Sequence, residues 1–246
     1  MIPFFRRIRK QMADDNKPLK YLRYAIGEIV LVVIGILIAL SINNWNENRK
    51  RQNEELILLA DVKNNLETTL SSFRSDTIYN ANTIVQYHKI ENYIDNDLPY
   101  SIELDSVFGI LTFWSGPTIT ATAYNSLQSK GLDLIKNEAL KQDIINMYEE
   151  VLKGLFTDYE NGESKLSEVI VDPFFVKHVK RLNNKSLNLA RPNDFESLKK
   201  NQEFSNILSA IIRQRKRGII YYTVVMNQIE TLIDEIENEI DLRKEK

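Results

Sequence analysis

The stretch that decides the fold is YAIGEIVLVVIGILIALSI, residues 24–42, in which Glu28 is the single charged side chain. A helix of this length rises about 28 Å, close to the roughly 30 Å hydrocarbon core of a bilayer. Backbone groups in lipid need partners within their own segment, so the stretch must be helical there. Tyr21, Tyr24 and Trp45 flank it at positions that suit the membrane interfaces. We therefore predict a single transmembrane helix and a lipid bilayer as partner; a buried helix of a soluble domain is the alternative.

Basic residues on the two sides of this stretch predict its orientation. Residues 1–23 hold seven Lys and Arg against two Asp, whereas three basic residues (49–51) follow the stretch closely. The positive-inside bias then places the N-terminus in the cytoplasm and the large domain in the periplasm, with the span in a bacterial inner membrane. The topology-setting residues that we single out are Arg6, Arg7, Arg9, Lys10 and Arg23.

The N-terminal region leaves two questions open. The tripeptide Ala39-Leu40-Ser41 resembles a signal-peptide cleavage site, but the basic region is 23 residues long and the apolar run exceeds the usual 7 to 15 residues, so we favour an uncleaved anchor. Phe5, Ile8 and Met12 align on one face if residues 1–12 are helical, which suits a segment lying on an anionic leaflet. A disordered basic tail that only sets the topology is the alternative.

One face of the predicted span favours contact with another helix. Glu28, Val32, Gly35 and Ala39 recur at helical spacing, and Gly35-x-x-x-Ala39 is a small-x-x-x-small pattern that lets two backbones approach closely. A carboxylate in an apolar span is costly and usually faces protein or water. The expected partner is a second copy of the chain or another membrane protein. Two other interpretations remain: Glu28 extends toward the headgroups, or it belongs to a proton or ion pathway.

The block YAIGEIVLVVIGILIALSINNWNENRK (residues 24–50), behind the FFRRIRK head (residues 4–10), resembles an uncharacterised family of short single-pass membrane proteins associated with the Bacteroidota. The similar residues run from Phe4 to about Arg51, and the rest of the chain fits as a variable helical domain. The resemblance implies membrane anchoring and a bacterial origin. It implies no activity and no catalytic residue.

The remaining residues, 43–246, predict a helical domain, which makes the fold all-α. The chain has 8 Gly and 6 Pro, few for the many turns that a sheet protein needs. A long helix over about 47–94 carries apolar residues at heptad spacing and continues the transmembrane helix; a closing helix over about 204–243 shows the same spacing. The apolar heptad residues are Leu59, Leu66, Phe73, Tyr87 and Ile94 in the first, joined by Leu56, Leu70 and Ile84, and Leu208, Tyr222, Ile229 and Ile236 in the second.

Shorter helices over about 105–181 connect the two. We expect Asp105 and Asn137 to cap two of them, Gly131 to end a helix over 122–130, Asn161-Gly162 to break the helix that Asn137 begins, and residues 182–194 to form a loop. The two long helices would then pair as an antiparallel bundle. Pairing between chains explains the heptads equally well.

We find no pattern that predicts catalysis. Cysteine is absent, and His88 and His178, the two histidines, lack a second ligand at metal-binding helical spacing, so we expect no metal, no cofactor and no enzyme activity. The net charge of −7 after residue 23 argues against nucleic acid. One basic cluster offers an anionic partner a place to bind, although it suits a solvated helix surface equally: Arg213, Arg215, Lys216 and Arg217.

The sequence therefore favours a membrane-anchored helical interaction protein, as an oligomer or an accessory subunit of a membrane complex. A periplasmic ligand sensor that passes a conformational signal to a membrane partner is the alternative. Because residues 1–23 are too short for an output domain, such a sensor would have to signal through another protein.

Overall fold

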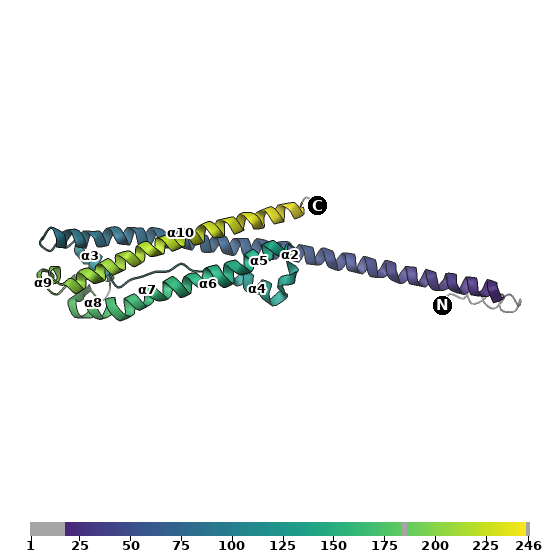
Figure 1. Ribbon diagram of the computed structural model, residues 1–246, viewed down its shortest axis with the longest axis horizontal. Helices are drawn as coiled ribbons and strands as arrows, with labels where there is room; N and C mark the ends of the chain where they lie inside the picture. Colours follow the sequence, from purple (N-terminus) through teal and green to yellow (C-terminus); the bar gives the residue numbers. More distant parts are fainter. Residues whose placement is uncertain (1–17, 184–185, 245–246) are drawn as a thin grey trace. The chain divides into compact units, whose positions relative to one another are not determined.

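The computed structural model describes residues 18–183 and 186–244, which are mostly helical (Figure 1). The chain divides into two compact units, Met1–Glu55 and Leu56–Lys246. Helix α2 (Pro18–Asp95) contains both the apolar tract and the first long helix of the second unit. This confirms the predicted all-α class and the continuation of the apolar helix into a long one.

In the first unit, the aliphatic side chains of α2 lie on the surface. Every Ile, Leu and Val from residue 26 to residue 42 is between 46% and 70% exposed. Among the described residues, α2 is the one helix that is long and apolar enough to cross a membrane. Such exposure in water opposes the hydrophobic effect, so this surface requires an apolar surrounding.

In the second unit, the rest of α2 packs antiparallel to helix α10 (Gln202–Lys244) (Figure 1). Lys63 pairs with Glu237, and the guanidinium of Arg74 lies 2.6 Å from a carboxylate oxygen of Glu230. Next to Arg74 on α2, the ring of Phe73 meets the ring of Tyr222 edge to face, with centroids 5.4 Å apart. Residue numbers thus fall along α10 as they rise along α2.

The heptad positions predicted to be apolar and inward are buried on both long helices. Leu59, Leu66, Phe73 and Tyr87 on α2 are at most 1% exposed, and Ile94 at the end of the seam is partly buried. The corresponding α10 residues are equally enclosed: Leu208, Tyr222, Ile229 and Ile236. Burial of aliphatic and aromatic area is the main source of stability in such a domain.

A third helical run packs against this pair. It extends from Glu138 to His178 and alternates α-helical with wider π-helical turns. The α-helical pieces are α5 (Glu138–Asn146), α6 (Leu152–Leu155), α7 (Asn161–Leu166) and α8 (Asp172–His178), and the π-helical turns are η2 (Met147–Val151), η3 (Phe156–Glu160) and η4 (Ser167–Val171). The predicted break at Asn161-Gly162 is wrong, because a glycine inside a packed helix costs only about 1 kcal/mol.

The caps of the shorter helices follow the sequence prediction with one exception. The Asn137 side chain accepts a hydrogen bond from the Leu140 N–H at the start of α5, and Gly131, with φ 107°, follows α4 (Thr122–Lys130). A short 3₁₀ turn, η1 (Leu132–Leu134), joins them. Asp105 is not a cap: α3 (Leu104–Gly109) begins before it, and its buried carboxylate accepts two hydrogen bonds from Arg191.

Residues predicted as a loop form a β-hairpin instead. Strands β1 (Val179–Asn183) and β2 (Ser186–Pro192) pair antiparallel, and α9 (Phe195–Lys199) follows them. The backbone of β2 passes so close to α3 that a Cβ on Gly109 would lie 2.1 Å from the Asn188 carbonyl oxygen. The hairpin packs on α3 through this contact and through the hydrogen bonds of Arg191 to Asp105. Both contacts join residues far apart in sequence, so a local sequence pattern does not predict them.

An extended segment, residues 113–121, joins α3 to α4 and lies along a polar face of α2. The N–H of Thr118 donates to the Ser72 hydroxyl at 2.8 Å, and the N–H of Thr120 donates to the Thr69 hydroxyl at 3.0 Å. Asn65 accepts from the Ala123 N–H at 2.9 Å. Side chains of α2 thus replace the neighbouring strand that an extended segment usually needs.

Candidate functional site

The predicted contact stripe of the first unit is open on its small-residue side. A Cβ added at Gly35 would meet no atom within 4 Å, Val32 is 55% exposed, and Ala39 is exposed. Glu28, on the same stripe, is half-buried. Backbone of a second helix can therefore approach this face closely, as the small-x-x-x-small pattern requires.

The flanking residues are described only in part. Trp45 is 64% exposed, and the guanidinium of Arg49 lies 5.4 Å from its ring centroid. Arg23 is exposed. The side chains of Tyr21 and Tyr24 fall outside the described part of the chain, as do Arg6, Arg7, Arg9 and Lys10.

The basic cluster on α10 is smaller than predicted. Arg213, Lys216 and Arg217 are exposed, and the guanidinium of Arg217 lies 5.4 Å from the Tyr221 ring centroid. Arg215 is 2% exposed, so its assignment to a surface patch is wrong. Arg215 occupies a heptad position that faces the core, and its guanidinium pairs with Glu163 inside the domain.

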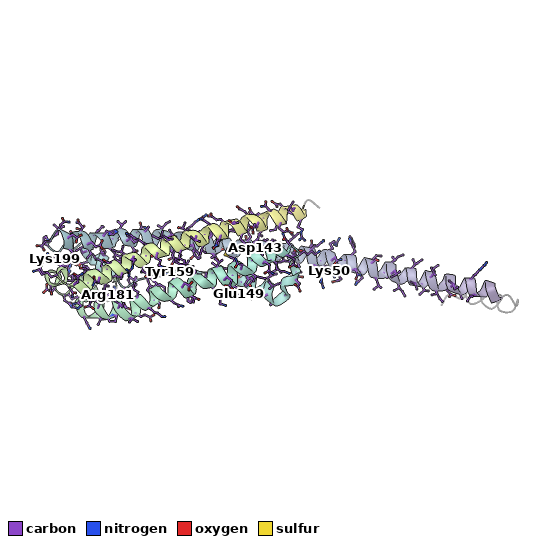
Figure 2. All side chains as sticks on the ribbon, viewed as in Figure 1. Lys50, Asp143, Glu149, Tyr159, Arg181 and Lys199 are labelled. Atoms are coloured by element: carbon purple, nitrogen blue, oxygen red, sulfur yellow. The ribbon has the colours of Figure 1, made fainter. Side chains whose placement is uncertain are left out.

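Arg215 belongs to a buried polar centre in the second unit, which we define as Asp76, Asn80, Tyr159, Glu160, Glu163, Arg215 and Tyr222. These residues come from α2, from the η3–α7 part of the third helical run, and from α10. Figure 2 labels Tyr159 toward the middle of this unit. Each of the seven side chains is at most 8% exposed.

Arg215 and Glu163 form the ion pair of this centre. A guanidinium Nη1 of Arg215 lies 2.9 Å from Oε1 of Glu163, and its Nη2 donates to the Phe113 carbonyl oxygen at 2.8 Å. Nε and Nη1 of Arg215 have no hydrogen-bond partner among the described residues, so the buried charge is offset by its closeness to Glu163 and by the hydrogen bond to Phe113. Burial raises the pKa of Glu163, and the Arg215 charge opposes that rise.

Glu160 has a neutral donor in place of a cation. The Tyr222 hydroxyl donates to Oε1 of Glu160 at 2.6 Å. The other carboxylate oxygen, Oε2, packs against Gly116, where an added Cβ would lie only 2.2 Å from it. Nearby, Asp76 accepts a hydrogen bond from the Ser115 hydroxyl at 2.7 Å. Burial raises the pKa of Glu160, and the Glu163 and Asp76 charges add to the rise, whereas the Tyr222 hydrogen bond and the Arg215 charge oppose it. Burial likewise raises the pKa of Tyr222, which keeps its hydroxyl a donor.

Gly218 makes room for the Tyr159 hydroxyl. A Cβ at residue 218 would lie 2.1 Å from that oxygen, which donates to the Gln214 carbonyl at 3.2 Å. The π-helical turn η3 ends at Glu160, directly after Tyr159. Tyr159 and Glu160 are thus the last two residues of a π-helical turn, a feature that is frequent at functional sites, and Glu163 follows in α7.

Asn80 is fully buried, and neither its Oδ1 nor its Nδ2 has a hydrogen-bond partner in the described part of the protein. It lies one helical turn after Asp76 on α2, midway in sequence between Phe73 and Tyr87. Phe73 contacts Tyr222. Burial raises the pKa of Tyr87, and the nearby Arg215 charge opposes that rise. Asn80 therefore lies on the same buried face of α2 as Asp76.

Surface grooves lie between α5 and α10. Two of them share Asp143 and Glu235, and burial together with the Asp143 charge raises the pKa of Glu235. Within residues 18–183 and 186–244, no group of three or more His, Cys, Asp or Glu side chains is placed to hold a metal ion. His88 pairs with Glu91, and the His178 ring stacks on Phe174.

This polar centre was not predicted from the sequence. Arg215 and Gly218 leave gaps in the otherwise apolar heptads of α10. These two positions were the sequence signal for the polar centre. A charged residue on a core-facing heptad position requires a polar partner, and a glycine there leaves room for a large neighbouring side chain.

One family matches the chain: a family of unknown function (DUF6090), over residues 28–202. The chain belongs to this family. The matched range includes most of the apolar tract and continues through the helical domain, so the family extends well beyond the Phe4–Arg51 region on which the resemblance was based. No curated protein and no solved structure matches the chain.

Proposed function

We propose that the chain is a single-pass membrane-anchored interaction protein without catalytic activity of its own, acting as an oligomer or as an accessory subunit of a membrane complex. The observation that carries the proposal is the unbroken run of exposed aliphatic side chains from residue 26 to residue 42. Lipid is the surrounding that such a run requires. The basic residues before it favour a cytoplasmic N-terminus and a periplasmic domain in a bacterial inner membrane.

The open stripe at Gly35 and Ala39 supports the interaction part of the proposal. In lipid, helices associate through close packing and interhelical hydrogen bonds, because apolar side chains gain nothing by leaving the lipid. A face with two small residues and one carboxylate offers both kinds of contact. The partner is a second copy of this chain or another membrane helix.

Labelling of single cysteines tests the anchor and its orientation. The chain has no natural cysteine, so N82C in the domain and D15C before the span each give one reactive thiol. In intact spheroplasts, a membrane-impermeant maleimide should label N82C, because Asn82 is exposed, and should label D15C only after lysis. Labelling of D15C alone would reverse the orientation, and recovery of either variant in the soluble fraction would refute the anchor.

Substitutions in the span test the interaction. The full chain in mild detergent should cross-link to itself or to a stable partner, and Gly35→Leu should reduce the cross-linked fraction at least several-fold, because a bulky side chain separates the backbones. Val33→Leu, which adds bulk nearly opposite on the helix, is the matched control and should leave association unchanged. A chain that is monomeric throughout, and whose melting temperature rises with a small molecule, would instead support a ligand sensor.

A further inference from the structure

The buried polar centre contains more negative than positive charge. Asp76, Glu160 and Glu163 are 8%, 6% and 3% exposed, and Arg215 is the cation within the defined set. Arg215 lies 2.9 Å from Glu163 and donates to the Phe113 carbonyl, and its charge also opposes the rise in the pKa of Glu160 without forming an ion pair with it. A carboxylate that is buried without a cation is costly, and the usual relief is protonation.

Glu160 is the carboxyl group in this position. Its hydrogen-bond donor is the neutral Tyr222 hydroxyl, and no ion pair reaches it from the residues that the structure describes. The charged and titratable groups around it come from every packed element: Asp76 and Tyr87 on α2, Tyr159 and Glu163 on its own helical run, and Arg215 and Tyr222 on α10. Segment 113–116 contributes Ser115, which does not titrate.

Asn80 provides a second, independent observation at the same place. Its amide is fully buried on the face of α2 that also carries Asp76, and it has no hydrogen-bond partner in residues 18–183 and 186–244. An amide can donate to a carboxylate and can also accept from a carboxylic acid, so Asn80 is compatible with either protonation state of a nearby carboxyl group.

We propose that Glu160 is a proton-binding site built into the domain: it takes up a proton at a pH at which exposed glutamates are ionised, and the bound proton strengthens the packing of α2, η3 and α10 around it. The proton converts an unpaired buried charge into a neutral acid. When the proton leaves, the negative charge faces Glu163 and Asp76, and the three-helix contact weakens.

The sign of the pH dependence follows from the direction of the shift. The pKa of Glu160 is raised in the folded chain, so the folded state binds more protons than the unfolded state between the ordinary glutamate value, about 4.3, and the raised value. The contribution of Glu160 to stability is complete below that window. It is lost as the pH rises through the folded-state pKa.

Urea denaturation of the full chain in detergent, followed by circular dichroism from pH 4.5 to 8, tests the proposal. The unfolding constant of the natural chain should rise with pH, by up to tenfold per pH unit from this one group. Glu160→Gln should remove that part of the slope and should resist urea better than the natural chain at pH 8. The exposed control Glu150→Gln should keep the slope of the natural chain.

Glu163→Gln separates proton binding from a general need for charge. It leaves Arg215 without its partner, so it should lower stability at every pH. The slope that Glu160 contributes should persist over a narrower pH range, because the Glu163 charge no longer raises the pKa of Glu160. If Glu160→Gln retained the slope, or were less stable than the natural chain at pH 8, the proposal would be refuted.

Tyr222→Phe keeps the proposal testable if Glu160→Gln does not fold. This variant removes the hydrogen bond that favours the ionised form of Glu160, so the proton should be held to higher pH. The sloping part of the stability curve should then extend to higher pH than in the natural chain. An unchanged curve would contradict the proposal.

Discussion

The two units of the chain use similar aliphatic side chains in opposite ways. Between residues 26 and 42 every Ile, Leu and Val is exposed, whereas the inward heptad positions of α2 and α10 in the second unit are almost completely enclosed. The described residues leave the first surface uncovered, so it depends on a surrounding outside residues 18–183 and 186–244. The second is satisfied by the fold itself, since each apolar stripe has a partner within residues 56–244.

The carboxylates of the two regions differ in burial. Glu28 of the apolar tract is half-buried, whereas Glu163 of the second unit is 3% exposed and lies 2.9 Å from Arg215. Heptad periodicity alone does not distinguish an anchor from a core. What separates the two regions is whether a complementary surface exists elsewhere in the sequence.

Removal of the buried cation should have the largest effect on the second unit. Arg215→Met leaves Glu163 buried without a counter-charge, and breaking a buried pair from one side costs about 3–5 kcal/mol. The matched control is Arg213→Met on the exposed side of the same helix, which should stay within about 0.5 kcal/mol. Urea denaturation at pH 7 measures both. Equal effects of the two substitutions would show that the buried pair contributes nothing special.

Removal of one aliphatic side chain from each region should give the next largest difference. Leu66→Ala opens a cavity at a fully buried position and should cost about 2–5 kcal/mol of domain stability. Leu37→Ala, at a position 56% exposed, should leave the urea midpoint of the domain unchanged. If Leu37→Ala lowered the midpoint as much as Leu66→Ala, the apolar tract would be part of the domain core rather than a separate surface.

The features that were predicted from sequence depend on local spacing. Heptads identified Leu66, Phe73 and Tyr222 as buried, Asn137 was recognised as a cap, and Gly131 as the end of α4. Each of these follows from residues within one or two helical turns. Such signals survive in the folded protein because tertiary contacts reinforce them.

The features that were missed depend on distant residues. The hairpin contacts α3 where β2 meets Gly109 and where Arg191 reaches Asp105, 86 residues away in sequence. The sequence around Glu160 and Glu163 is like that around many solvated carboxylates. These two side chains are buried because α10, far away in sequence, packs against them through Tyr222 and Arg215. The alternation of α and π turns in the third helical run has no local sequence mark either.

The hydrogen bonds between α2 and the segment that joins α3 to α4 limit how much the length of that segment can vary. Its donors meet acceptors on α2 that are four, three and four residues apart: Asn65, Thr69, Ser72 and Asp76. One extra residue between Ser115 and Thr118 would move each donor on one side of the insertion past its acceptor. Unlike most surface connections, this segment should therefore tolerate no insertion or deletion, because its length must match the spacing of its acceptors on α2.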